Sequence, residues 1–183
     1  MTAVRRIVVG VHGSLGSLQA LRYAADEARE RGVPLVPVIA WVPPGGDVAE
    51  RGRPSPYLRR VWREAARDRL YAAFDDGLGG VPEDLRVELY VERGETGPVL
   101  AGLADEPGDL LVIGTGRRSR VSRGLRKSVG RYLLAHAKCP VVAVPPSALM
   151  DELRRPRPTG LRWPLRRRHG NIDLSEISEL SGK

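Results

Sequence analysis

The chain alternates between short continuous apolar runs and longer segments in which apolar residues recur every three or four positions. Runs of the first kind, such as Ile7–Val11 and Leu110–Ile113, are typical of strands buried on both faces of a parallel sheet. Segments of the second kind, such as Leu18–Ala28, predict amphipathic helices. We therefore predict strands at 7–11, 35–42, 85–91, 110–114 and 141–144, with helices at 14–32, 58–73, 96–103 and 128–136 between them.

Strict alternation of strands and helices indicates a parallel α/β sheet with helices on both faces, a Rossmann-like arrangement. The segment from Pro43 to Pro56 is rich in proline, glycine and charge, and we interpret it as a long connecting loop. In such a sheet, ligands bind beyond the carboxyl ends of the strands at the topological switch point. The loops Gly10–Ser17 and Gly114–Ser128 are therefore the predicted location of a site.

The pattern ends at Pro145-Pro146, and the residues beyond it differ in kind. We predict an α/β domain over residues 1–146 and a basic, disordered tail over residues 147–183. The segment Arg154–Arg168 holds seven arginines together with Trp163. That composition suits nucleic acid or an anionic surface, and a solvated extension is the alternative interpretation.

Composition narrows the function classes. The net charge of +8 favours anionic partners, and the single cysteine excludes a disulfide framework and a cysteine-based zinc site. The spacing of the three histidines and of the carboxylates suggests no metal site. The apolar run near the N-terminus is too short for a secretion signal, and no stretch reaches the length of a transmembrane span. We therefore expect a cytoplasmic location.

Enzyme motifs are absent or incomplete. The sequence contains no Walker phosphate loop. The stretch His12–Gly16 resembles a nucleophile elbow but has His12 in place of its first glycine, so a capped turn before a helix is the better interpretation. Cys139, His136 and Trp62 are interpreted as packing residues. We predict that the protein is not an enzyme.

The loop from Gly114 to Val129 has the form of an anion site, because a helix that begins at Ser128 would direct its backbone N–H groups toward a phosphate. Here the sequence resembles the universal stress protein family, in collinear order over about residues 4–146. The resemblance rests on Arg6–Ser14, Asp109–Thr115, Lys127–Val129 and Cys139–Val144. It implies a five-stranded parallel sheet of order 3-2-1-4-5, a binding or regulatory role in stress, and a homodimer formed through the last strand, Val141–Val144.

The resemblance also implies where ATP would bind. Nucleotide-binding members carry Gly-x-x-Gly, nine residues, then Gly-Ser/Thr after the fourth strand, and an aspartate at the end of the first. Here Gly114 and Ser128 match, but Arg117 and Lys127 replace the second and third glycines, and His12 replaces the aspartate. The candidate nucleotide contacts are Gly10, Val11, His12, Ala40, Gly114, Arg117, Lys127, Ser128 and Val129.

These departures leave two hypotheses open. In the first, the site has degenerated, and ATP binding is weak or absent because side chains at 117 and 127 hinder the close approach of the backbone to phosphate. In the second, Arg117 and Lys127 replace the backbone contacts with charge-assisted contacts. We interpret His12 as a surface substitution rather than a catalytic residue, because no carboxylate or nucleophile is placed to use its imidazole.

Overall fold

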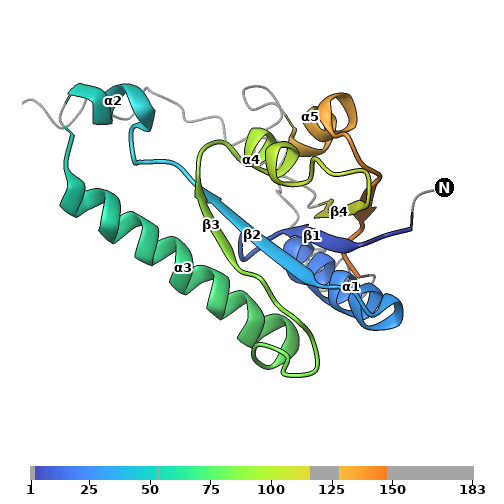
Figure 1. Ribbon diagram of the computed structural model, residues 1–183. Helices are drawn as coiled ribbons and strands as arrows, with labels where there is room; N and C mark the ends of the chain where they lie inside the picture. Colours follow the sequence, from blue (N-terminus) through green and yellow to red (C-terminus); the bar gives the residue numbers. More distant parts are fainter. Residues whose placement is uncertain (1–2, 53, 116–127, 148–183) are drawn as a thin grey trace, which may run out of the picture. The chain divides into compact units, whose positions relative to one another are not determined.

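The structure is a computed structural model that describes residues 3–52, 54–115 and 128–147, all within one compact unit, Met1–Leu153. Its centre is a five-stranded parallel sheet of order β3-β2-β1-β4-β5, which confirms the predicted topology (Figure 1). The strands are β1 (Arg6–Gly10), β2 (Leu35–Trp41), β3 (Tyr90–Arg93), β4 (Asp109–Gly114) and β5 (Val141–Val144).

Helices cover both faces of this sheet. The helices α1 (Leu15–Arg31) and α3 (Pro56–Leu78) pack on one face over the larger core cluster. The helices α4 (Thr96–Leu103) and α5 (Val129–His136) pack on the other face, and they lie above the sheet in Figure 1. The central strands β1, β2 and β4 are almost wholly buried, as their continuous apolar runs predict.

Helix α1 forms as its sequence predicts. Ser14 is its N-cap and accepts a hydrogen bond from the Ser17 N–H, and Gly32 ends it in the left-handed region at φ 64°. Its apolar stripe of Leu18, Leu21, Ala25 and Ala28 is buried against the sheet. The turn between β1 and α1 is therefore fixed by local sequence signals.

Two elements differ from the prediction. Within the segment expected to be a loop, the chain forms a short helix, α2 (Gly46–Gly52). The predicted strand at 85–91 is shorter and shifted to Tyr90–Arg93, because Val87 makes only an isolated bridge to Leu35 before regular pairing begins. The apolar residues of 85–89 still pack on the core. The alternating pattern therefore predicted which residues are buried but not where the strand begins and ends.

Helix α3 extends beyond the part that the core supports. Its buried residues, Ala66, Leu70, Ala73, Phe74 and Gly77, all lie in its second half. In the first ten residues, only Trp62 is even half-buried. Leu58, the first residue of the helix predicted over 58–73 from its apolar spacing, is 41% exposed, so that spacing did not report burial there.

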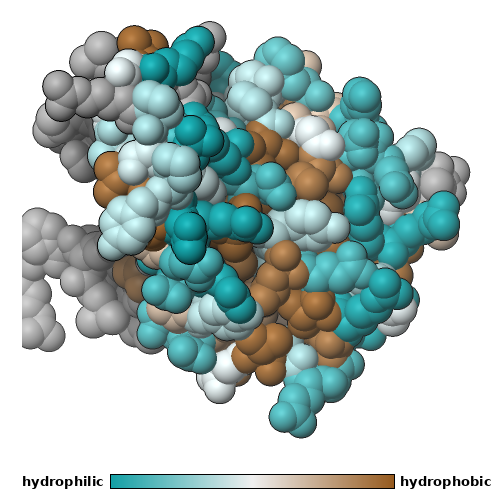
Figure 2. Space-filling view, turned by 60° about the vertical axis from the view of Figure 1, so that its left-hand side comes forward, coloured by the Kyte–Doolittle hydropathy of each residue, from teal (hydrophilic) through white to brown (hydrophobic). Residues whose placement is uncertain are grey.

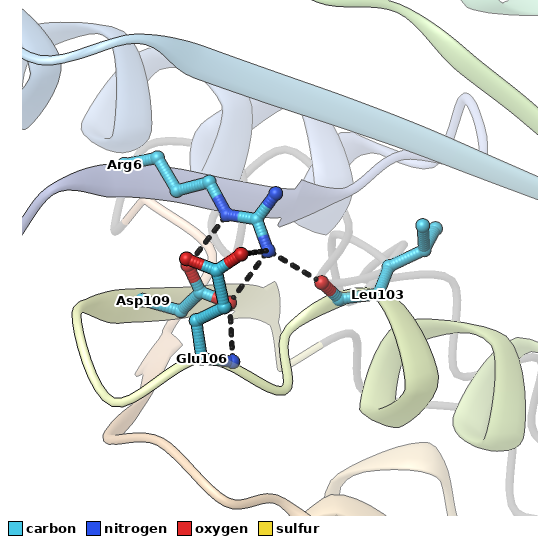
Figure 3. Close-up of polar contacts among 4 residues, drawn as sticks. All are labelled: Arg6, Leu103, Glu106 and Asp109. Atoms are coloured by element: carbon cyan, nitrogen blue, oxygen red, sulfur yellow. Dashed lines mark hydrogen bonds and ion pairs between the residues drawn. The ribbon is translucent and has the colours of Figure 1, made fainter.

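A charged cluster ties the two central strands together at their amino ends. The Asp109 carboxylate, 1% exposed, accepts hydrogen bonds from Arg6 Nε at 2.6 Å, Arg6 Nη2 at 3.0 Å and the Glu106 N–H at 3.1 Å (Figure 3). Arg6 Nη2 also donates to the Leu103 carbonyl. The hydrogen bonds to Asp109 raise the pKa of Arg6, so the guanidinium keeps its charge.

Candidate functional site

The candidate site lies at the carboxyl ends of β1 and β4, the adjacent strands at which the order of the sheet reverses. Pairing of Val9 with Val112 brings the ends of these strands, Gly10 and Gly114, to the same edge. Val11 is buried there and donates its N–H to the Val38 carbonyl at 2.8 Å, which joins the end of β1 to β2. The edge is therefore built from rigid strands, as expected for a doubly wound sheet.

The turn after β1 satisfies much of its own hydrogen bonding. The His12 N–H donates to Ser17 Oγ at 3.3 Å, and Ser17 Oγ donates to the Ser14 carbonyl at 2.8 Å. Gly13 supplies the positive φ of 79° that the turn requires. The His12 side chain itself is exposed to solvent at this edge.

Gly114 is fixed by packing against α1. A Cβ at this position would lie 2.1 Å from the carbonyl oxygen of Gly16 and 2.8 Å from the backbone nitrogen of Ser17. Backbone atoms cannot move aside as a flexible side chain can, so only glycine fits. The close passage of β4 beside α1 therefore requires Gly114 even when no ligand is bound.

The N-terminus of α5 offers an anion a different environment from that of α1. Ser128 is its N-cap, is exposed, and makes no side-chain capping hydrogen bond, whereas Ser14 does cap α1. A Cβ on Gly130 would lie 3.5 Å from Ile113 Cδ1, so the first turn of α5 lies beside β4. Positive dipole and unused backbone donors at a helix start favour an anion.

The structure brings most of the predicted contacts to one edge. Gly10, Val11, His12 and Gly114 end β1 and β4, Ser128 and Val129 begin α5, and Ala40 lies on the neighbouring strand β2. Arg117 and Lys127 lie outside the described residues, as do residues 148–183 of the tail predicted over 147–183. Any contact of these two side chains with phosphate therefore remains a prediction from the sequence.

Ser17 is a residue of the site that sequence analysis missed. It is buried and links the His12 backbone to the N-cap of α1. The available signal was its spacing three residues after Ser14, which suits a helix start. Its contact with the His12 N–H depends on the path of the turn, which local spacing does not specify.

The packing residues behave in different ways. His136 is exposed, contrary to the prediction, and stacks on Tyr132 with a ring separation of 4.1 Å. Cys139 is half-buried against the α4–α5 core, and burial raises the pKa of its thiol, which disfavours the reactive thiolate. Trp62 is half-buried and packs on the α1–α3 core.

No group of three or more histidine, cysteine, aspartate or glutamate side chains in the described ranges is arranged to hold a metal ion. Within the same ranges, every helix is too short or too polar to cross a membrane.

Comparison with known proteins identifies the family. A model described as the Universal stress protein family matches residues 3–145. Two universal stress proteins of Mycobacterium tuberculosis strain H37Rv are similar. One is 29% identical and covers 75% of this chain and 47% of its own length. The other is 27% identical and covers 77% and 48%. This chain thus spans about half the length of these curated relatives.

Solved structures agree with this assignment. A universal stress protein in complex with cAMP is 28% identical, with a TM-score of 0.51, and covers 80% of this chain and 100% of its own. One from Archaeoglobus fulgidus in complex with dAMP is 26% identical, with a TM-score of 0.50, and covers 78% and 99%. With the order of the sheet and a family match over residues 3–145, the chain belongs to the universal stress protein family.

Proposed function

We propose that this chain is a non-enzymatic binding or regulatory domain that acts in the cytoplasm and binds ATP weakly or not at all at the β1–β4 edge. The observation that carries the proposal is the exposed His12 side chain at the end of β1. A carboxylate there would accept hydrogen bonds from ribose hydroxyls or hold a metal ion. An imidazole carries no negative charge and offers at most one acceptor nitrogen, so it cannot accept hydrogen bonds from two ribose hydroxyls or balance the charge of a metal ion as a carboxylate does.

Gly114 gives this proposal indirect support. It is the one glycine of the family's phosphate loop that the chain retains. Its contact with the Gly16 carbonyl explains why it is retained, because a Cβ would overlap α1. The glycine is thus accounted for by the fold and gives no separate indication that a phosphate binds beside it.

A second candidate function, adenine-nucleotide binding of useful affinity, is favoured by the start of α5. Ser128 Oγ accepts no hydrogen bond from the first N–H groups of α5. The N-cap side chain therefore leaves these donors available to an anion. The two similar structures with cAMP and dAMP show that related chains bind adenine nucleotides. In this alternative, the charged side chains of Arg117 and Lys127 contact the phosphate in place of the backbone contacts that glycines at these positions would allow.

Calorimetry on the full chain distinguishes the two. With ATP, AMP and cAMP at millimolar concentration, we expect no saturable binding to the wild type. The triple variant His12→Asp, Arg117→Gly, Lys127→Gly should bind ATP, because it restores the carboxylate and the close approach of the backbone. Arg118→Gly is the matched control, since it removes an arginine of the same loop without creating a motif glycine.

The contrary results are equally specific. If the wild type binds ATP and Lys127→Ala weakens that binding by roughly 10–150-fold, the charge-replacement alternative is correct, because one charge-assisted contact contributes about 1.5–3 kcal/mol. Tight wild-type binding that survives Lys127→Ala contradicts both versions. It leaves Ser128 and the start of α5 as the phosphate site.

The predicted partners extend this proposal. β5 is at one edge of the sheet, which supports a homodimer in which the last strands of two copies meet. Binding of nucleic acid or an anionic surface by Arg154–Arg168 stays a prediction from composition, because those residues lie outside the described part of the chain.

A further inference from the structure

The helix α2 carries a buried carboxylate that the candidate site does not use. The side chain of Glu50 is 5% exposed. Its Oε1 lies 2.5 Å from Arg59 Nε, and its Oε2 pairs with Arg93 Nη2. Neither oxygen has a hydrogen-bond partner of acceptable geometry among the described residues, so the carboxylate is held by charge rather than by directed hydrogen bonds.

Glu50 is the anchor of α2. Of the α2 side chains that the structure describes, it alone is buried, and Val48 is 78% exposed. Within the described chain, no other element packs extensively against α2. Gly45 precedes the helix and Gly46 begins it, with φ of 83° and 76°, a backbone region that glycine adopts without steric cost. Few apolar contacts hold this segment, so it should open more readily than the elements that pack on the sheet.

The two arginines, in contrast, belong to elements that stand without α2. Arg93 ends β3, where it pairs in register with Trp41. Arg59 lies in the first turn of α3, which Ser55 caps through the Leu58 N–H at 3.3 Å. Their side chains are 38% and 44% exposed, so neither arginine side chain is closed off from solvent. Both side chains contact the same carboxylate, so the two cations face one space around it.

We propose that Arg59 and Arg93 form an anion-binding site, that the Glu50 carboxylate occupies it in the closed state, and that a phosphate-bearing small molecule displaces α2 from it. A phosphate group carries more charge than a carboxylate and has three acceptor oxygens, which suits two guanidinium groups. Since Glu50 competes from within the chain, the apparent affinity of the wild type is reduced by the fraction of molecules in which α2 is open.

This site is separate from the candidate nucleotide site. Arg93 is on the edge strand β3, two strands from β1, or roughly 10 Å across the sheet. The proposal therefore does not depend on whether ATP binds at the β1–β4 edge. Both sites lie on the carboxyl side of the sheet, since Arg93 ends its strand as Gly10 and Gly114 end theirs.

Calorimetry with inorganic pyrophosphate at fixed ionic strength tests the competition. Glu50→Gln in the full chain should bind pyrophosphate at least 10-fold more tightly than the wild type. Adding Arg93→Gln should abolish that gain. Glu64→Gln is the matched control, because it removes an exposed glutamate of α3 that faces Arg67 at 3.7 Å. Binding to other basic segments is common to all variants, so it cancels in the differences.

Hydrogen exchange on the wild type tests the displacement without any substitution. Pyrophosphate should accelerate amide exchange in residues 43–55 and leave the strands unchanged, and Glu50→Gln should show the faster exchange without ligand. ATP serves as a second probe: acceleration in 43–55 that the Arg93→Gln variant lacks assigns its phosphates to this site, whereas protection confined to the β1–β4 edge assigns them to the other.

Two results would overturn the proposal. One is pyrophosphate affinity that is equal in the wild type and Glu50→Gln, which shows that the arginine pair is no anion site. The other is exchange in 43–55 that pyrophosphate slows or does not alter, which shows that α2 is not displaced and that Glu50 is only a structural ion pair.

Discussion

Gly114 ends β4 beside the first turn of α1. Because it has no side chain, the two backbones can pack closely there. We predict that Gly114→Ala lowers the free energy of unfolding by about 3 kcal/mol or more, because the new Cβ would overlap the backbone of Gly16. Urea denaturation monitored by circular dichroism measures this change.

A second glycine gives the matched control. Gly102 lies inside α4, and a Cβ there meets nothing within 4 Å. Gly102→Ala should therefore raise the free energy of unfolding by about 0.5–1 kcal/mol through helix propensity. If both substitutions gave the same change, the contact with Gly16 would not be what requires glycine at position 114.

Single residues also show where prediction from sequence stops. Ser14 and Gly32 were predictable as the ends of α1, because a cap acts on residues within one turn. The requirement for Gly114 was not, because it arises from Gly16, almost a hundred residues away. His136 was predicted to be packed because it follows Leu133 at helical spacing, yet it lies on the exposed flank of that face.

Among the elements, β1 and β4 are joined at their amino ends by the Arg6–Asp109 pair. We predict that Asp109→Ala lowers the free energy of unfolding by about 2–4 kcal/mol. The loss leaves Arg6 without its buried partner, and the 25% exposure of the Arg6 side chain keeps the cost below that of a fully buried charge.

The same denaturation measurement includes a surface pair as its reference. Glu64→Gln disrupts the pairing of Glu64 with Arg67, and both of these side chains are more than half exposed, so it should leave stability unchanged. An equally small effect of Asp109→Ala would contradict the structural importance of the buried pair.

The elements were predictable to the degree that apolar residues fix them. Continuous apolar runs located β1, β2 and β4, because both faces of these strands are covered by helices. Helix α2 was missed for a physical reason: it spans seven residues, and its buried anchor is the charged Glu50. A hydrophobic pattern gives no signal for a helix that is held by an ion pair.

At the scale of the whole molecule, the feature that bears on self-association is β5, an edge strand of the sheet. Val141 and Val142 are half-buried and Ala143 is exposed. We predict that the full chain sediments as a dimer at micromolar concentration and that Ala143→Arg shifts it to the monomer, because an arginine in the middle of the strand hinders close pairing of two edges.

Sedimentation velocity at several concentrations measures that shift. Unchanged thermal unfolding of Ala143→Arg at a concentration where both forms are monomeric shows that the fold is intact. A wild type that sediments only as a monomer, or a variant that remains dimeric, would place any self-association elsewhere than on β5.

The position of the Arg6–Asp109 pair bears on how such a domain diverges. It holds β1 and β4 at their amino ends, whereas His12, Arg117 and Lys127, the residues that depart from the nucleotide-binding pattern, all follow the carboxyl ends of these strands. The ion pair that joins the two strands and the predicted ligand contacts thus lie at opposite edges of one sheet. A lineage that changes its ligand, or loses it, can do so by substitutions at one edge while the other preserves the scaffold.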